Sequence, residues 1–134
     1  MERWLSLDDA ALAEVRSRAQ AALGRVGQTL IEIAPELSSV LGAQPELPEL
    51  GPAQARARLR HAFCSFVAAM GGQQPALLVV ENGEHADPAS LDLIDSLLGA
   101  SDKTPALVLL TVTSPTALAE LRERHQGTLL EIGP

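Results

Sequence analysis

Apolar residues in the first third of the chain recur at steps of three and four positions, which places them on one face of a helix. The stripe runs through Leu12, Val15, Ala19, Ala22, Val26, Leu30, Ile33, Leu37 and Val40. Two glycines and Pro35 interrupt it, and proline lacks the amide hydrogen that a helix interior needs. The pattern predicts two or three helices that end at Gly42. The first is expected to begin near Leu7, behind a capping box at residues 6–9 that starts with Ser6.

Residues 43–51 contain two prolines and a glycine with acidic residues between them, which predicts an extended connector. Pro52 then opens a helix at the position where proline is tolerated, and Gly71 and Gly72 end it. The predicted buried stripe of this helix is Leu59, Phe63, Phe66 and Met70. Three arginines lie largely off that stripe and mark either a solvated face or an anion site: Arg56, Arg58 and Arg60.

From residue 76 onward the pattern changes to short continuous apolar runs, which are typical of strands in a parallel sheet. These runs cover 76–80, 106–112 and 128–132. Between them, 88–98 and 115–125 each begin with a proline and show helical spacing. Strands joined by helices of crossover length predict parallel pairing with right-handed connections. The predicted fold class is therefore α/β, with three parallel strands and crossover helices behind a helical N-terminal half.

Composition narrows the possible functions. At 134 residues the chain is expected to form a single domain, 1–134, made of a helical segment 1–42, the connector 43–51 and an α/β part 52–134. Acidic residues outnumber basic ones by 17 to 10 and tyrosine is absent, so nucleic acid is not expected as a partner. No apolar run reaches the roughly 20 residues that span a bilayer, and the first residues lack a signal-peptide layout, so no membrane partner and a cytoplasmic location are expected.

The most informative polar stretch follows the first predicted strand, at the end of a parallel sheet where ligands usually bind. It reads Glu81-Asn-Gly-Glu-His-Ala-Asp87. Four apolar residues followed at once by polar, acidic positions are the layout of a Walker B segment. In such a segment a carboxylate at the strand end holds Mg²⁺ and the next acid orients a water molecule.

The sequence Ala86-Asp-Pro-Ala-Ser-Leu91 extends this layout and makes it specific. The stretch resembles the bacterial signalling ATPases called STAND proteins, P-loop modules related to AAA ATPases that accompany serine/threonine kinases, cyclases and LuxR-type regulators. Their usual pattern is four apolar residues, two aspartates, an apolar residue, Gln or His, and then Trp-Ala-Asp-Pro-Ala-Ser-Leu. Residues 33–66 are similar to the family's region between Walker A and Walker B, 107–112 to its sensor strand, and 129–134 to the strand before its lid. The resemblance implies a partial P-loop NTPase sheet.

The chain departs from the family pattern at the positions that carry chemistry. Glu81 replaces the first aspartate and could still meet a metal, whereas Asn82 replaces the second, and an amide cannot accept a proton from water. His85 replaces the tryptophan, and Ser114 stands where many relatives have an arginine. The phosphate-binding Gly-x-x-x-x-Gly-Lys-Ser/Thr motif is missing, since the only lysine, Lys103, follows a predicted helix in an unrelated context.

Two functions fit these departures. The chain is either a non-catalytic regulatory or protein-interaction module derived from a STAND-type ATPase domain, or an excised part of an ATP-binding switch whose Walker A lies outside it. No cofactor is expected for the isolated chain, and ATP with Mg²⁺ would be bound at Glu81 and Asn82 only if the parent protein supplies a P-loop. In the family the P-loop strand lies between the strands that correspond to 106–112 and 128–132. Without it, these two must pair directly or leave a gap for a partner, so another protein or a second copy of the chain is expected to bind.

Other residues of the loop and the histidines have alternative interpretations. Asp87 before Pro88 is either an N-cap that accepts the amide of Ser90 or its neighbour, or a ligand. Four side chains could together bind a metal, although they lie in a loop and include a single imidazole: Glu81, Glu84, His85 and Asp87. Cys64 is expected to be an inert, buried thiol. His61 and His125 are expected to occupy solvated helix positions without a chemical role. No nucleophile elbow of the form Gly-x-Ser-x-Gly is present, so hydrolase chemistry has no support.

Overall fold

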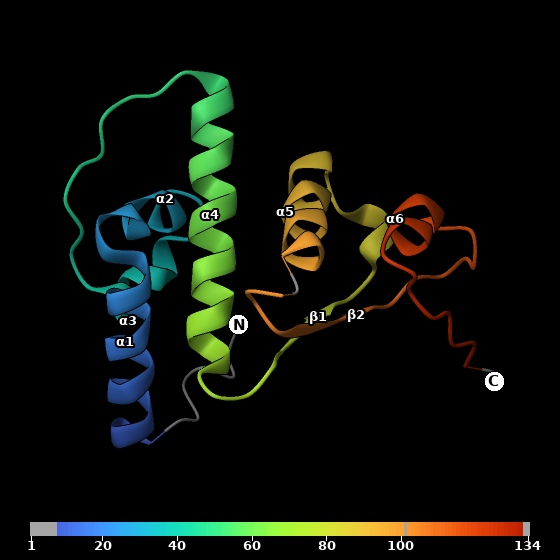
Figure 1. Cartoon of the computed structure of the whole chain (residues 1–134), viewed down its shortest axis with the longest axis horizontal. Helices are drawn as coiled ribbons and strands as arrows, with labels where there is room; N and C mark the ends of the chain where they lie inside the picture. The colour runs from blue at the N-terminus through green and yellow to red at the C-terminus, as the bar shows by residue number, and fades with distance from the viewer. Residues whose placement is uncertain (1–7, 101, 133–134) are drawn as a thin grey trace.

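The computed structural model describes residues 8–100 and 102–132 and has a mixed α/β fold (Figure 1). Its N-terminal part holds α1 (Asp9–Leu23), α2 (Gly27–Ile31) and α3 (Ser38–Leu41), with short 3₁₀ turns at Gly24–Val26 and Pro35–Leu37. The rest holds α4 (Pro52–Gly71), β1 (Ala76–Val80), a 3₁₀ turn at Gly83–His85, α5 (Pro88–Gly99), β2 (Ala106–Leu110) and α6 (Ala119–Arg124). No helix within the described ranges is both long and apolar enough to cross a bilayer.

Most helix boundaries lie at glycine or proline residues. Gly42, with a φ of 72°, ends α3, and Pro52 begins α4 after the extended connector, as predicted. The start of α1 is different: Asp8 caps it by accepting the amide of Ala11 at 2.7 Å. The helix begins at Asp9, two residues after the expected position, and the expected cap Ser6 lies outside the described residues.

Helix α4 lies in the middle of the molecule, with α1, α2 and α3 on one side and α5 and the sheet on the other (Figure 1). The main buried cluster lies on the first side and consists of Ala19, Leu23, Leu30, Leu41, Ala62 and Ala69. Elements on both sides bury residues of α4 around its circumference, including Ala62, Val67 and Ala69. The four members of the predicted stripe, Leu59, Phe63, Phe66 and Met70, all pack against the main buried cluster, although each is only partly buried.

Strands β1 and β2 pair in parallel, with Ala76 opposite Ala106 and Val80 opposite Leu110. The predicted strand–helix–strand unit with parallel pairing is therefore confirmed for these two strands and α5. Helices α4 and α5 cover one face of the sheet (Figure 1). Along both strands partly buried residues alternate with exposed ones, so the described residues leave the other face open to solvent.

The predicted third strand is absent from the part of the chain that the structure describes: residues 128–132 have no regular structure there, and within the same residues β1 pairs with β2 alone. Strand β2 ends at Leu110 rather than at 112, and the helix predicted over 115–125 is reduced to α6. The cause is Leu118, whose left-handed backbone (φ 56°) is incompatible with an earlier helix start. Six helical residues rise about 9 Å, whereas a five-residue strand spans about 17 Å. The rise of α6 thus covers only about half the length of a strand, and residues 128–132 are not paired with β2.

Candidate functional site

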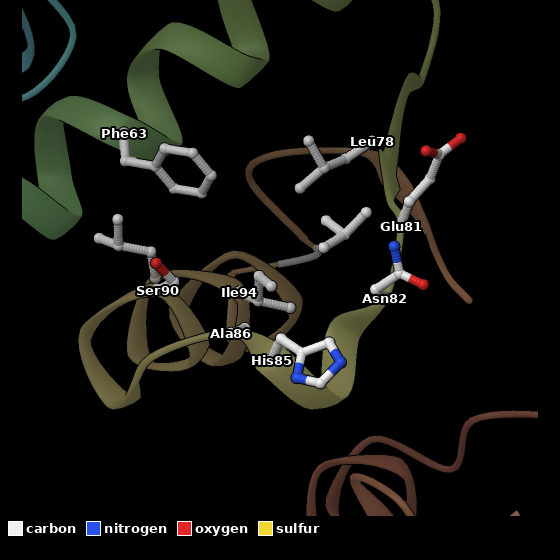
Figure 2. A pocket seen from close by; sticks show the side chains of 10 residues that line it. Phe63, Leu78, Glu81, Asn82, His85, Ala86, Ser90 and Ile94 are labelled. Carbon is white, nitrogen blue, oxygen red and sulfur yellow. The ribbon is translucent and has the colours of Figure 1, made fainter. Parts of the chain in front are cut away.

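The loop after β1 and the segment after β2 lie together at the carboxyl end of the sheet, as the strand register requires. A groove of about 540 Å³ opens there, shown in Figure 2. Its walls are mostly apolar, from α4, β1 and α5, and its polar side chains come from the loop and the start of α5. The lining residues are Phe63, Leu78, Val80, Glu81, Asn82, His85, Ala86, Ser90, Leu93 and Ile94. In Figure 2 the carboxylate of Glu81 points away from the apolar walls, whereas Leu78 points toward them.

Asn82, at the second Walker B position, is held by its backbone. Its φ of 53° and ψ of 49° are left-handed, a conformation that asparagine tolerates better than most residues. Its amide donates to Thr111 Oγ1 at 3.0 Å, and the next amide, of Gly83, donates to the Thr111 carbonyl at 2.8 Å. Asparagine at this position therefore has a structural reason that is independent of any bound nucleotide.

Glu84 joins the loop to the segment after β2. Its Oε1 accepts hydrogen bonds from the Thr113 hydroxyl at 2.7 Å and from the Thr113 amide at 3.2 Å. The hydroxyl bond is the main reason why the pKa of Glu84 lies below its usual range. This carboxylate is therefore used to hold two loops together.

Asp87 is the N-cap of α5, which confirms the first of the two interpretations. Its Oδ1 accepts the Ser90 amide at 2.8 Å and its Oδ2 accepts the Ser90 hydroxyl at 3.1 Å. These bonds, the amide bond foremost, hold the pKa of Asp87 below its usual range. The carboxylate satisfies amide donors that the first turn of every helix leaves unpaired.

Replacing Asp87 with alanine is expected to lower the melting temperature by several degrees, because the first turn of α5 loses its acceptor. Replacement with asparagine should cost much less, since asparagine caps nearly as well. Thermal unfolding followed by circular dichroism at pH 7 measures both. Equal losses for the two variants would show that the charge, and not the cap, is what the protein needs from this residue.

Asn82 gives a second test of the same loop. Asn82→Ala is expected to lower the free energy of unfolding by about 1 kcal/mol, because a Cβ without a local polar group is disfavoured in the left-handed region. Asn82→Gly should be close to neutral, since glycine enters this region freely. Urea unfolding measures the difference. Alanine as stable as glycine would mean that the loop is free to leave this conformation.

The predicted metal cluster is not assembled. Among the residues that the structure describes, no group of three or more His, Cys, Asp or Glu side chains is placed to hold a metal ion. Glu84 and Asp87 instead bond to Thr113 and Ser90. A role for exposed Glu81 in holding Mg²⁺ stays a prediction.

A second polar cluster, between α5 and the end of α6, was not predicted from the sequence. Asp95 Oδ1 accepts from His125 Nε2 at 2.8 Å and from Arg124 Nη1 at 2.7 Å. The hydrogen bond with His125 is the main reason why the pKa of Asp95 lies below its usual range. The side chain of His125 is only 17% exposed, so its prediction as a solvated position was wrong, whereas His61 is exposed as expected. No local pattern could reveal a contact between residues 30 positions apart.

The remaining candidates have structural surroundings. Arg58 donates to the Pro48 carbonyl at 3.0 Å and Arg60 pairs with Asp92 at 3.4 Å, so two of the three arginines contact the protein itself rather than forming an open anion site. Cys64 is half-buried rather than fully buried, and burial raises the pKa of its thiol. Lys103 lies exposed in the turn between α5 and β2.

Comparison with known proteins gives no relative: no family model matches the chain, and neither a curated protein nor a solved structure matches it.

Proposed function

We propose that the chain is a non-catalytic regulatory or protein-interaction module derived from a STAND-type ATPase domain, acting in the cytoplasm of a bacterium. The observation that carries the proposal is that the polar residues after β1 form hydrogen bonds within the protein that hold the loop in place. Asn82 occupies a left-handed turn fixed by Thr111, Glu84 holds Thr113, and Asp87 caps α5. The positions that would serve metal and water in a Walker B segment thus maintain the loop.

The uncovered face of the sheet supports the interaction half of the proposal. Parallel sheets occur almost only with both faces covered, because their strands are apolar on both sides. Here four large aliphatic side chains face solvent on one side: Leu77, Val79, Leu107 and Leu109. A contiguous apolar patch of this kind is typical of a surface that binds another polypeptide.

A calorimetric titration of the chain with ATP and Mg²⁺ tests the proposal. No micromolar binding is expected, since no phosphate-binding loop is present to supply amides and a lysine. Glu81→Gln should leave the melting temperature unchanged with and without Mg²⁺, because the carboxylate is exposed and has no structural task. Asn82→Asp is the variant to compare in the same titration, because aspartate also tolerates the left-handed turn and restores the second acid of the Walker B pattern. Micromolar ATP affinity, or Mg²⁺-dependent stabilisation that Glu81→Gln abolishes, would overturn the proposal.

The second candidate function is that of an excised part of an ATP-binding switch whose Walker A lies outside this chain. It is favoured by one observation: among the described residues no strand pairs with the outer edge of β2, where the family places its P-loop strand. A Walker A motif in the polypeptide that accompanies this chain, with ATP binding by the two together and by neither alone, would establish this function. Absence of binding by the two together would exclude it.

A further inference from the structure

The open face of the sheet is a continuous aliphatic surface. The strand register places Leu77 opposite Leu107 and Val79 opposite Leu109. The four side chains are 63%, 65%, 49% and 48% exposed, in that order. Beside them, the outer edge of β2 pairs with no strand in the described ranges. Such an edge carries amide and carbonyl groups ready to pair with another strand.

Residues 128–132 are suited to pair with such an edge. They form an apolar segment without regular structure, in which Leu130 is 76% exposed and Ile132 is 96% exposed. Figure 1 shows this segment running away from β1 and β2, beyond α6. In this position the segment is not paired with the β2 of its own chain.

We propose that two copies of this chain form a dimer by exchange, in which residues 128–132 of each copy pair along the free edge of β2 of the other. The proposal rests on the function as an interaction module and names the partner. Leu130 and Ile132 are two positions apart and so share one face of an extended strand. Added to β2, they extend the aliphatic surface of Leu77 and Leu107, and the extended surfaces of the two copies bury each other.

A second copy fits better than an unrelated protein because one chain holds both the unpaired segment and the unpaired edge. Exchange of an identical element is a low-cost route to a symmetric dimer. A stable interface buries about 1,200–2,000 Å² in total and takes about 20–30 residues from each side, far more than the four side chains of the open face. Burial of the exchanged segments and of two strand pairings, in addition to both faces, brings the interface toward that size.

Charge gives the dimer a distinguishing property. Each copy carries a net charge of −7, so two copies repel one another at long range. Salt screens that repulsion, and the dimer is expected to tighten as the salt concentration rises. A complex with a basic partner would instead weaken as the salt concentration rises.

Sedimentation equilibrium of the whole chain from low to high micromolar concentration tests the proposal. The expected result is a species of twice the chain mass that dissociates on dilution. Ile132→Lys should raise the dissociation constant at least about tenfold, because it places a charge in the buried interface. The variant cannot unfold the single copy, since Ile132 is 96% exposed there. Leu107→Lys should have the same effect from the other side of the interface.

The matched control is Ile33→Lys. Ile33 is 62% exposed, close to the 65% of Leu107, but it follows α2 on the far side of α4 from the sheet. It should leave the dissociation constant unchanged. Hydrogen exchange should show protection of 106–110 and 128–132 that increases with protein concentration.

A chain that stays monomeric throughout, a dimer indifferent to Ile132→Lys, or a dimer weakened equally by Ile33→Lys would each overturn the exchange. None of these outcomes bears on whether the chain binds ATP or on whether it binds a different protein. The proposed function fails only through its own calorimetric test.

Discussion

Replacing Leu41 with alanine is expected to lower the free energy of unfolding by about 2–5 kcal/mol. The side chain is 1% exposed and belongs to the buried cluster that joins α1, α2, α3 and α4. Truncation removes apolar contacts and leaves a cavity, because helices held by several neighbours collapse only in part. Leu41 lies directly beside α2: a Cβ added at Gly27 would be at 3.5 Å, ordinary van der Waals distance, from Leu41 Cδ1. Urea unfolding followed by circular dichroism measures the loss.

Leu50→Ala is the matched control for Leu41→Ala. It removes the same atoms from the extended connector, where Leu50 is 42% exposed. Its cost is expected to stay within about 0.5 kcal/mol, the usual range of surface substitutions. Similar losses for the two variants would mean that the cluster around Leu41 contributes little to stability.

The elements predicted correctly are those with local chemical causes. Proline at the first helical position fixed the starts of α4 and α5, and Gly42 and Gly72 ended α3 and α4. Parallel pairing of β1 with β2 followed from two apolar runs separated by a helix. Each of these features depends on residues within a few positions, or on the length of one connection.

The elements predicted wrongly depend on distant parts of the chain. Residues 128–132 have an apolar pattern suited to a strand, but a strand also needs a neighbour, and α6 does not carry the segment to one. The left-handed conformation of Leu118, which shortens α6, is rare for leucine and leaves no trace in the pattern. The apolar stripe of α4 packs against the main cluster, but the sequence did not reveal that this helix is covered on opposite sides.

The candidate site likewise combines features with local causes and features that depend on distant residues. The cap at Asp87 could be predicted because donor and acceptor are three residues apart. The bonds from Asn82 to Thr111 and from Thr113 to Glu84 join residues 29 positions apart, and only the register of the two strands brings them together. The place of the loop after the first predicted strand could be predicted from the apolar pattern, whereas its bonding pattern required the structure.

Enlarging Ala62 to leucine is expected to lower the free energy of unfolding by about 1–3 kcal/mol, through overpacking. Ala62 is fully buried in α4 and belongs to the same cluster as Ala19 of α1, which is also 0% exposed. Small side chains let these helices approach closely, so three added carbons must displace a helix or adopt a strained rotamer. Ala53→Leu is the matched control, because Ala53 is exposed in the first turn of α4 and leucine has nearly the helix propensity of alanine. Urea unfolding should leave the Ala53 variant near the parent and shift the Ala62 variant to lower denaturant. If both variants matched the parent, α4 would have room at its centre, and the close approach of α1 to α4 would not be what holds the helical part together.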